Sequence, residues 1–177
     1  MGRTMKVLIA YATGHGSTGE VAQFIGDVLK EHDIDVTVQL ANQVQSVSDY
    51  DAFVVGSPIY GGMWLTELSQ FLDKFKAELS MKPVHLWIAC IRVLEADGLE
   101  HALREYVHQA ILNELGIKDV AVFAGKLDLG VIDWNERWTL AARYDGDALP
   151  GSRNDDYRDW DAIRTWAKHI REELVPN

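Results

Sequence analysis

Tyr11-Ala-Thr-Gly-His-Gly-Ser-Thr18 is the stretch that decides the fold, because it joins a continuous apolar run, residues 5–11, to an amphipathic helix expected to begin near Ser17. A strand that turns tightly into a helix brings backbone N–H groups and the positive end of the helix to one point. The hydroxyl groups of Thr13, Ser17 and Thr18 add side-chain donors to the same turn. The stretch therefore predicts an anion site, and the expected anion is a phosphate.

Two common phosphate-binding loops fit this stretch poorly. A Walker loop requires a lysine directly after its last glycine, and none follows Gly16. Gly14, Gly16 and Gly19 match the dinucleotide pattern Gly-x-Gly-x-x-Gly literally, but the expected second strand, residues 34–40, does not end in the acidic residue that should bind the ribose. A single phosphate held by neutral donors is typical of a flavin mononucleotide (FMN) site. The Thr13-x-x-Gly16-x-Thr18 arrangement resembles the phosphate loop of flavodoxins.

The composition describes an ordinary globular chain. Its 177 residues, 47% hydrophobic and 25% charged, suit one domain (residues 1–177) with a sizeable core, and they exclude disordered and collagen-like classes. No apolar stretch is long enough for a membrane span, no secretion signal is evident, and Cys90 is the only cysteine. We therefore expect a cytoplasmic protein without an internal disulfide.

The net charge of -10 bears on partners. An acidic surface repels nucleic acid and anionic lipid, and it favours a redox partner that carries a basic patch. The alternative is that the acidity serves only solubility.

Apolar patterns alternate between strand and helix along the whole chain. Expected strands cover residues 5–11, 34–40, 52–56, 84–91 and 120–124, apolar helical stripes cover 21–29, 65–79 and 99–111, and a last helix follows an N-cap at Asp159. This alternation predicts an α/β fold of three layers, with a five-stranded parallel sheet in the order 2-1-3-4-5. In that order a ligand should lie at the loops that follow strands one, three and four.

The loops after the third and fourth strands are expected to hold the flavin ring. Gly61 and Gly62 would let the main chain approach the ring, and a peptide turning over there could present a carbonyl to flavin N5. Tyr60 and Trp64 are candidates for stacking on the ring, with packing at a helix start as the alternative. The expected cofactor-binding residues are Thr13, Gly14, His15, Gly16, Ser17, Thr18, Ser57, Pro58, Ile59, Tyr60, Gly61, Gly62, Met63, Trp64, Cys90, Ile91 and Arg92.

The remaining chemistry-bearing residues suggest neither a catalytic group nor a metal site. Cys90 is interpreted as a small core residue rather than a redox thiol, and Arg92 either reaches the ring or a substrate or is an ordinary surface arginine. The six histidines lack metal-ligand spacing, and Gly56-Ser57-Pro58 is no nucleophile elbow. The chemistry is therefore expected to belong to a cofactor.

Beyond the phosphate loop, the whole chain resembles a subgroup of flavodoxin-domain proteins that includes the bacterial quinone-dependent protoporphyrinogen oxidases. The matching segments, in order, are Tyr11-Ala-Thr13 with Gly16 and Thr18, Val55-Gly-Ser-Pro-Ile-Tyr-Gly-Gly62, Phe123-Ala-Gly-Lys-Leu127 before a long insert, and Tyr157-Arg-Asp-Trp-Asp-Ala-Ile163. In the oxidases the insert is basic and apolar, which implies a membrane and quinone contact. Here residues 126–158 contain five Lys or Arg against seven Asp or Glu, so stable membrane association is not expected.

Three functions remain open at this point. The first is an FMN-binding redox protein that relays electrons between a reductase and an acceptor, at a low reduction potential because acidic surroundings disfavour added negative charge. The second is an FMN-dependent oxidoreductase acting on protoporphyrinogen IX, a quinone or a similar small aromatic substrate, with the insert as a lid or substrate wall. The third is a binding or regulatory module without flavin.

Overall fold

The computed structural model describes residues 3–127, 130 and 155–176 of the chain. Its first half contains β1 (Lys6–Tyr11), α1 (Ser17–Lys30), β2 (Asp35–Leu40), η1 (Ala41–Gln43), β3 (Ala52–Tyr60), β4 (Met63–Trp64), α2 (Thr66–Lys74) and α3 (Lys76–Leu79). Its second half contains β5 (Val84–Ala89), η2 (Ile91–Leu94), α4 (Gly98–Glu105), α5 (Gln109–Leu115), β6 (Val120–Phe123), β7 (Lys126–Leu127), β8 (Asp155–Asp156) and α7 (Trp160–Leu174).

Five parallel strands form the central sheet in the order β2-β1-β3-β5-β6, which confirms the predicted order 2-1-3-4-5. β1 lies between β2 and β3, where Ile9 pairs with Val38 on one side and with Val54 on the other. The chain leaves β1 for β2 on one side of it and then returns for β3 on the other. The carboxyl ends of β1 and β3 therefore meet at the point where a ligand site was expected.

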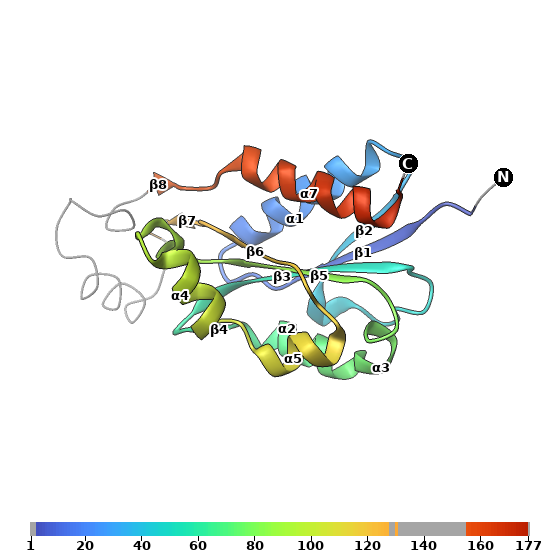
Figure 1. Cartoon of the computed structure of the whole chain (residues 1–177), viewed down its shortest axis with the longest axis horizontal. Helices are drawn as coiled ribbons and strands as arrows, with labels where there is room; N and C mark the ends of the chain where they lie inside the picture. The colour runs from blue at the N-terminus through green and yellow to red at the C-terminus, as the bar shows by residue number, and fades with distance from the viewer. Residues whose placement is uncertain (1–2, 128–129, 131–154, 177) are drawn as a thin grey trace.

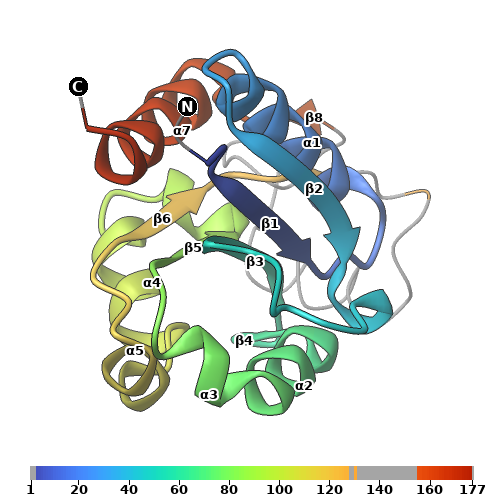
Figure 2. The ribbon, with the colours of Figure 1, turned by 90° about the vertical axis from the view of Figure 1, so that its right-hand side faces the viewer.

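Helices cover both faces of the sheet (Figures 1 and 2). α1 and α7 lie together on one face, where Ile25, Leu29 and Ile163 are fully buried. α2, α3, α4 and α5 cover the other face, where Leu68 and Leu79 are fully buried. β1 is closed in by both layers, which explains why its sequence is a continuous apolar run rather than an alternating one.

The ends of two helices follow from local residues, and the N-cap of the last helix is the predicted one. Asp159 is the N-cap of α7, and its carboxylate accepts a hydrogen bond from the Ala162 backbone N–H at 2.9 Å. Gly116 ends α5 in the left-handed conformation, at φ 67°, where a side chain would be strained.

Three details differ from the predictions. β3 continues to Tyr60 and turns back into β4 as an antiparallel hairpin, so residues 57–60 are strand rather than loop. Both long helices expected on the second face are broken, the first at Phe75 and the second between α4 and α5. Apolar spacing continues across such breaks, because the stripe faces the same sheet on either side of them. Leu99, expected on the inner face, is 52% exposed at the start of α4.

The insert begins and ends in a short antiparallel pair, β7 with β8, in which Lys126 is opposite Asp156. In Figure 1 this pair lies beyond the carboxyl end of the sheet, on the left. The rest of the insert lies outside the described residues.

Candidate flavin site

The loop between β1 and α1 is closed by its own residues. The Thr13 hydroxyl oxygen accepts a hydrogen bond from the Gly16 N–H at 2.8 Å, and the Ala12 N–H donates to the Gly56 carbonyl of β3 at 2.9 Å. Gly16 has φ 92° and ψ -23°, a left-handed conformation that suits glycine, and it is the N-cap of α1. The loop thus has a defined shape set by Thr13 and Gly16.

The loop presents polar backbone at the end of a helix. Gly14, His15 and Gly16 are exposed, Ser17 is half-buried and Thr18 is buried beneath them, at 3% exposure. The N–H groups that open a helix have no intrahelical acceptor, so those of Ser17 and Thr18 are directed to the loop end of α1. This arrangement can bind an oxyanion with neutral donors.

The β3–β4 hairpin packs against this loop through Tyr60. A Cβ atom at Gly14 would lie 2.6 Å from the Tyr60 ring, and the Tyr60 and His15 rings meet edge to face with centroids 5.7 Å apart. Gly14 is therefore needed for the close approach of Tyr60. The sequence offered both residues as candidates but gave no sign that they touch.

The turn of the hairpin is formed by Gly61 and Gly62, at φ 59° and 79°. Two consecutive positive φ values are what a tight two-residue hairpin requires, and glycine adopts them without strain. Gly61 is exposed, and the ring of Tyr106 lies near Gly62. The glycine pair is thus explained first by the turn, and its proposed contact with a flavin remains a prediction.

Two other candidates on the hairpin are part of the core. Trp64 is 5% exposed, its Nε1 donates to the Ser69 hydroxyl at 2.8 Å, and its ring packs edge to face on His108. This is the packing role that was the alternative to stacking. Ser57 is fully buried, and its hydroxyl accepts from the Leu65 N–H at 2.9 Å and donates to the Pro58 carbonyl, so it joins β3 to the start of α2.

Cys90 and Arg92, which lie in the expected binding segment after β5, also make structural contacts. Cys90 is buried, and its N–H donates to the Phe123 carbonyl at 2.9 Å, so this N–H continues the sheet instead of facing a ligand. Arg92 is not an ordinary surface arginine, and its contact with a flavin ring or a substrate stays a prediction. Its guanidinium pairs with Glu95 at 2.7 Å and Asp97 at 3.1 Å, and its side chain is 19% exposed. Arg92 thus stabilises the turn between η2 and α4.

An arginine beside the loop was not among the residues expected from the sequence. Arg158 follows β8, and its guanidinium reaches the first turn of α1, where it pairs with the Glu20 carboxylate. Nothing in the spacing of the two residues, 138 positions apart, relates them. Only the pairing of β7 with β8, which brings the end of the insert back to the sheet, places Arg158 there.

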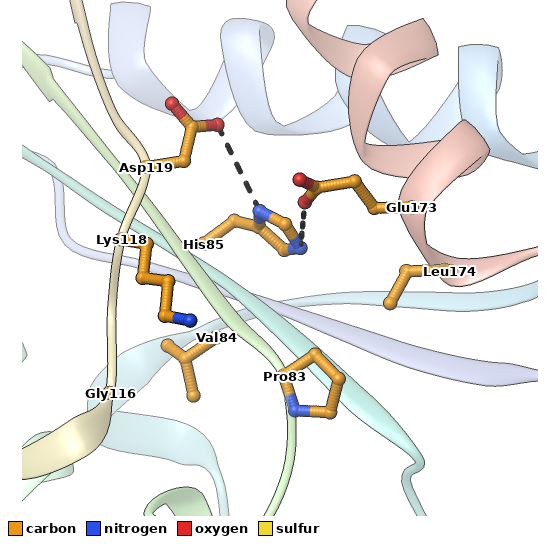
Figure 3. A pocket seen from close by; sticks show the side chains of 8 residues that line it. All are labelled: Pro83, Val84, His85, Gly116, Lys118, Asp119, Glu173 and Leu174. Carbon is orange, nitrogen blue, oxygen red and sulfur yellow. Dashed lines mark ion pairs between the residues drawn. The ribbon is translucent and has the colours of Figure 1, made fainter.

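A cavity of about 230 Å³ lies at the opposite, amino edge of the sheet (Figure 3). His85 lies buried in its wall, with Nδ1 3.9 Å from Asp119 and Nε2 3.7 Å from Glu173. Neither ring nitrogen has a hydrogen-bond partner among the described residues. Burial lowers the pKa of His85 below its usual value, and the two carboxylates only partly oppose this.

In the described part of the chain, no three or more His, Cys, Asp or Glu side chains are placed to hold a metal ion. None of the helices in residues 3–127 and 155–176 is long and apolar enough to cross a membrane.

Comparison with known proteins agrees with this geometry. A family model described as a flavodoxin domain matches residues 8–146. Protoporphyrinogen IX dehydrogenase [quinone] of Escherichia coli strain K12 is 24% identical over 171 residues, which cover 94% of each chain. Among solved structures, a flavodoxin from the domain Archaea (TM-score 0.61, 15% identity, 96% of this chain and 99% of that one) and flavodoxin 2 from Bacillus cereus (TM-score 0.61, 19% identity, 95% and 99%) share the fold. The chain therefore belongs to the flavodoxin-domain family, whose domain typically binds FMN.

Proposed function

We propose that this protein binds FMN at the carboxyl edge of its sheet and relays electrons between a reductase and an acceptor. The observation that supports this most directly is the loop of residues 13–18, a turn of glycines and hydroxyl residues with His15 at the start of α1. Such a turn suits one phosphate group without a lysine or arginine in the loop itself.

The residues present fit the phosphate end of FMN. The backbone N–H groups of Gly14, His15, Ser17 and Thr18 and the hydroxyls of Thr13 and Ser17 are the groups that would hold the phosphate, since the Gly16 N–H already donates to Thr13. The Thr13 hydroxyl accepts from Gly16 and so still has its own hydrogen to donate. Gly14 leaves room for the Tyr60 ring beside the loop, where a Cβ atom would collide with it.

Tyr60 is the residue that we propose to contact the flavin ring. It is the last residue of β3, the central strand, and it touches the phosphate loop. A flavin whose phosphate is bound by the loop could therefore place its ring against Tyr60. Trp64 supports this hairpin from the core instead of contacting the ring. Ser57, Cys90 and Arg92 likewise hold the frame on which the site is built.

FMN, when bound, supplies the capacity to accept and donate one or two electrons. The chain supplies the binding, the orientation of the ring and the surrounding charge. A net charge of -10 disfavours additional negative charge on a bound group and should lower its reduction potential. The same charge would favour a partner protein with a basic surface.

The test is to add FMN to the purified protein, remove the excess and record the visible spectrum. Retained flavin absorption, together with a reduction potential below that of free FMN, would support the proposal. Absence of retained flavin would favour the module without flavin, and a potential well above that of free FMN would contradict the electrostatic argument.

A second candidate function is an FMN-dependent oxidoreductase acting on protoporphyrinogen IX or a quinone. It is favoured by the similarity to the Escherichia coli dehydrogenase, which spans 94% of both chains and therefore includes the insert. Steady-state turnover of either compound by the FMN-loaded protein would select the enzyme over the carrier. Slow turnover of both, with fast electron exchange with a reductase, would select the carrier.

A further inference from the structure

Arg158 is held rigidly between the base of the insert and the phosphate-loop helix. Its side chain is 5% exposed, and it donates to both carboxylate oxygens of Asp156, at 2.8 and 2.6 Å. On the other side it pairs with Glu20 and donates to the Ser17 carbonyl at 3.4 Å. The guanidinium therefore lies at the first turn of α1, in contact with the end of the loop at Ser17.

Aromatic packing also holds the Arg158 guanidinium in place. The guanidinium lies over the Trp160 ring, 4.7 Å from its centroid, and Trp160 packs edge to face on Phe24 of α1 at 4.9 Å. Hydrogen bonding to Asp156 raises the pKa of Arg158 above its usual range, so the group stays charged. A buried, fixed and permanently charged arginine has a defined electrostatic effect on its neighbours.

Glu20 creates an electrostatic conflict at this helix end. The Glu20 carboxylate lies in the first turn of α1, where it stabilises the helix by interacting with the positive end of the helix dipole. A phosphate bound at the same end would compete with Glu20 for that dipole and would be repelled by it. Salt would screen the repulsion between the Glu20 carboxylate and a phosphate at this helix end only partly, because the screening length is about 8 Å at physiological ionic strength.

We propose that Arg158 is a positioning residue for the phosphate site: it offsets part of the charge of Glu20, because it shares its own charge between Glu20 and Asp156, and it anchors the first turn of α1, so that the loop can accept a phosphate. This inference rests on the proposed binding of FMN. It adds a cation that acts through Glu20, outside the loop of neutral donors.

The chain offers a matched control, an arginine whose carboxylate partner lies at the other end of α1. Arg164 of α7 pairs with Glu31 at 3.4 Å, just after the last turn of α1, and its guanidinium lies over the Phe24 ring at 4.9 Å. Arg164 thus joins α7 to α1 by the same kinds of contact as Arg158. It differs in lying far from the phosphate loop along the helix.

The experiment compares FMN with riboflavin, which lacks the phosphate, by titration at low ionic strength. Arg158→Ala is expected to weaken FMN binding by about three- to tenfold and to leave riboflavin binding unchanged, because only the phosphate meets the uncompensated Glu20. Arg158→Ala combined with Glu20→Gln should recover most of the lost FMN affinity. Arg164→Ala should bind both flavins as the wild type does.

Contrary results would overturn either the inference about Arg158 or the proposed function, and the two cases can be told apart. Equal weakening of both flavins in Arg158→Ala, or no recovery in the double variant, would overturn the inference, because either would mark Arg158 as a general scaffold residue. Wild-type protein that bound neither flavin would overturn the proposed function itself. If Arg158→Ala does not fold, Glu20→Gln alone carries the test: tighter FMN binding with unchanged riboflavin binding supports the inference, and unchanged FMN binding overturns it.

Discussion

The two edges of the central sheet present opposite arrangements of charge. At the carboxyl edge, residues 13–18 offer backbone N–H groups and hydroxyls, and the nearest charges are already paired behind the loop. At the amino edge, His85 is buried between Asp119 and Glu173, and no residue in the described part of the chain forms a hydrogen bond with either ring nitrogen (Figure 3). The first arrangement suits the binding of an anion, whereas the second makes the stability of the fold depend on pH.

The sharpest way to test this contrast is to place a negative charge in the loop. Thr13→Asp keeps an oxygen that can accept from the Gly16 N–H, so the loop should keep its shape. The added carboxylate would repel a phosphate, and we expect FMN affinity to fall by about a hundredfold, as for an unpaired charge close to a bound ion. Riboflavin binding, measured by the same titration, should change little.

Thr13→Asn is the matched control, because the amide oxygen can accept the same hydrogen bond without a charge. It should retain most of the FMN affinity. A Thr13→Asp protein that still bound FMN as the wild type does would place the phosphate elsewhere.

The hairpin turn gives the next largest effect. Gly62→Ala would place a side chain at φ 79° with the Tyr106 ring at an ordinary contact distance of 3.6 Å, so backbone strain rather than collision should dominate. We expect a loss of about 1–2 kcal/mol in the free energy of unfolding, measured with urea. In the FMN-loaded protein, the separation between the two one-electron reduction potentials should also change.

Gly125→Ala provides the comparison for Gly62→Ala, since a Cβ atom there meets nothing within 4 Å and the backbone does not have a positive φ. It should be neutral. Unchanged one-electron potentials in Gly62→Ala would count against a peptide that turns over beside the flavin.

Substitution of Tyr60 should weaken binding of the flavin ring and leave binding of the phosphate unchanged. Tyr60→Leu removes an aromatic contact worth about 0.5–1.5 kcal/mol, so FMN and riboflavin should both bind roughly two- to tenfold more weakly. Tyr60→Phe should bind nearly as the wild type does. Trp64→Phe, which loses the bond to Ser69, should lower stability and leave flavin binding unchanged, whereas the reverse pattern would exchange the roles assigned to the two residues.

The smallest expected effect is the pH dependence that His85, at the amino edge, gives to the free energy of unfolding. Because burial lowers the pKa of His85 in the folded state, the unfolded chain binds a proton at higher pH than the folded chain does. The free energy of unfolding should therefore fall as the pH drops from about 7 through 6.5 toward 5, and this contribution should be absent in His85→Leu. Asp119 and Glu173 oppose the effect of burial, while His169 on α7 adds to it.

Urea unfolding of both proteins across this pH range measures the difference. If acidification stabilised the wild type relative to His85→Leu, the two carboxylates would outweigh burial, and His85 would act as a charged link between α7 and the sheet.

The sheet order and the phosphate loop could be predicted because both depend on local patterns. Continuous apolar runs mark buried strands, and the Thr13, Gly16 and Thr18 spacing lies within one turn. The N-cap at Asp159 was likewise predictable from its own few residues.

Contacts between distant segments could not be predicted in the same way. Tyr60 on Gly14, Arg158 on Glu20 and Asp119 beside His85 each join residues that only the folded sheet brings together. Trp64 shows the related limit, since an aromatic residue after a glycine turn has the same sequence pattern whether it faces a ligand or the core.

The central claim is that the loop of residues 13–18 holds the phosphate of a flavin mononucleotide. Calorimetric titration of the wild-type protein with FMN and then with riboflavin tests it most directly. We predict FMN binding at least about tenfold tighter than riboflavin binding, because charge-assisted hydrogen bonds contribute about 1.5–3 kcal/mol each. Equal affinity for the two flavins, or binding of neither, would contradict the account.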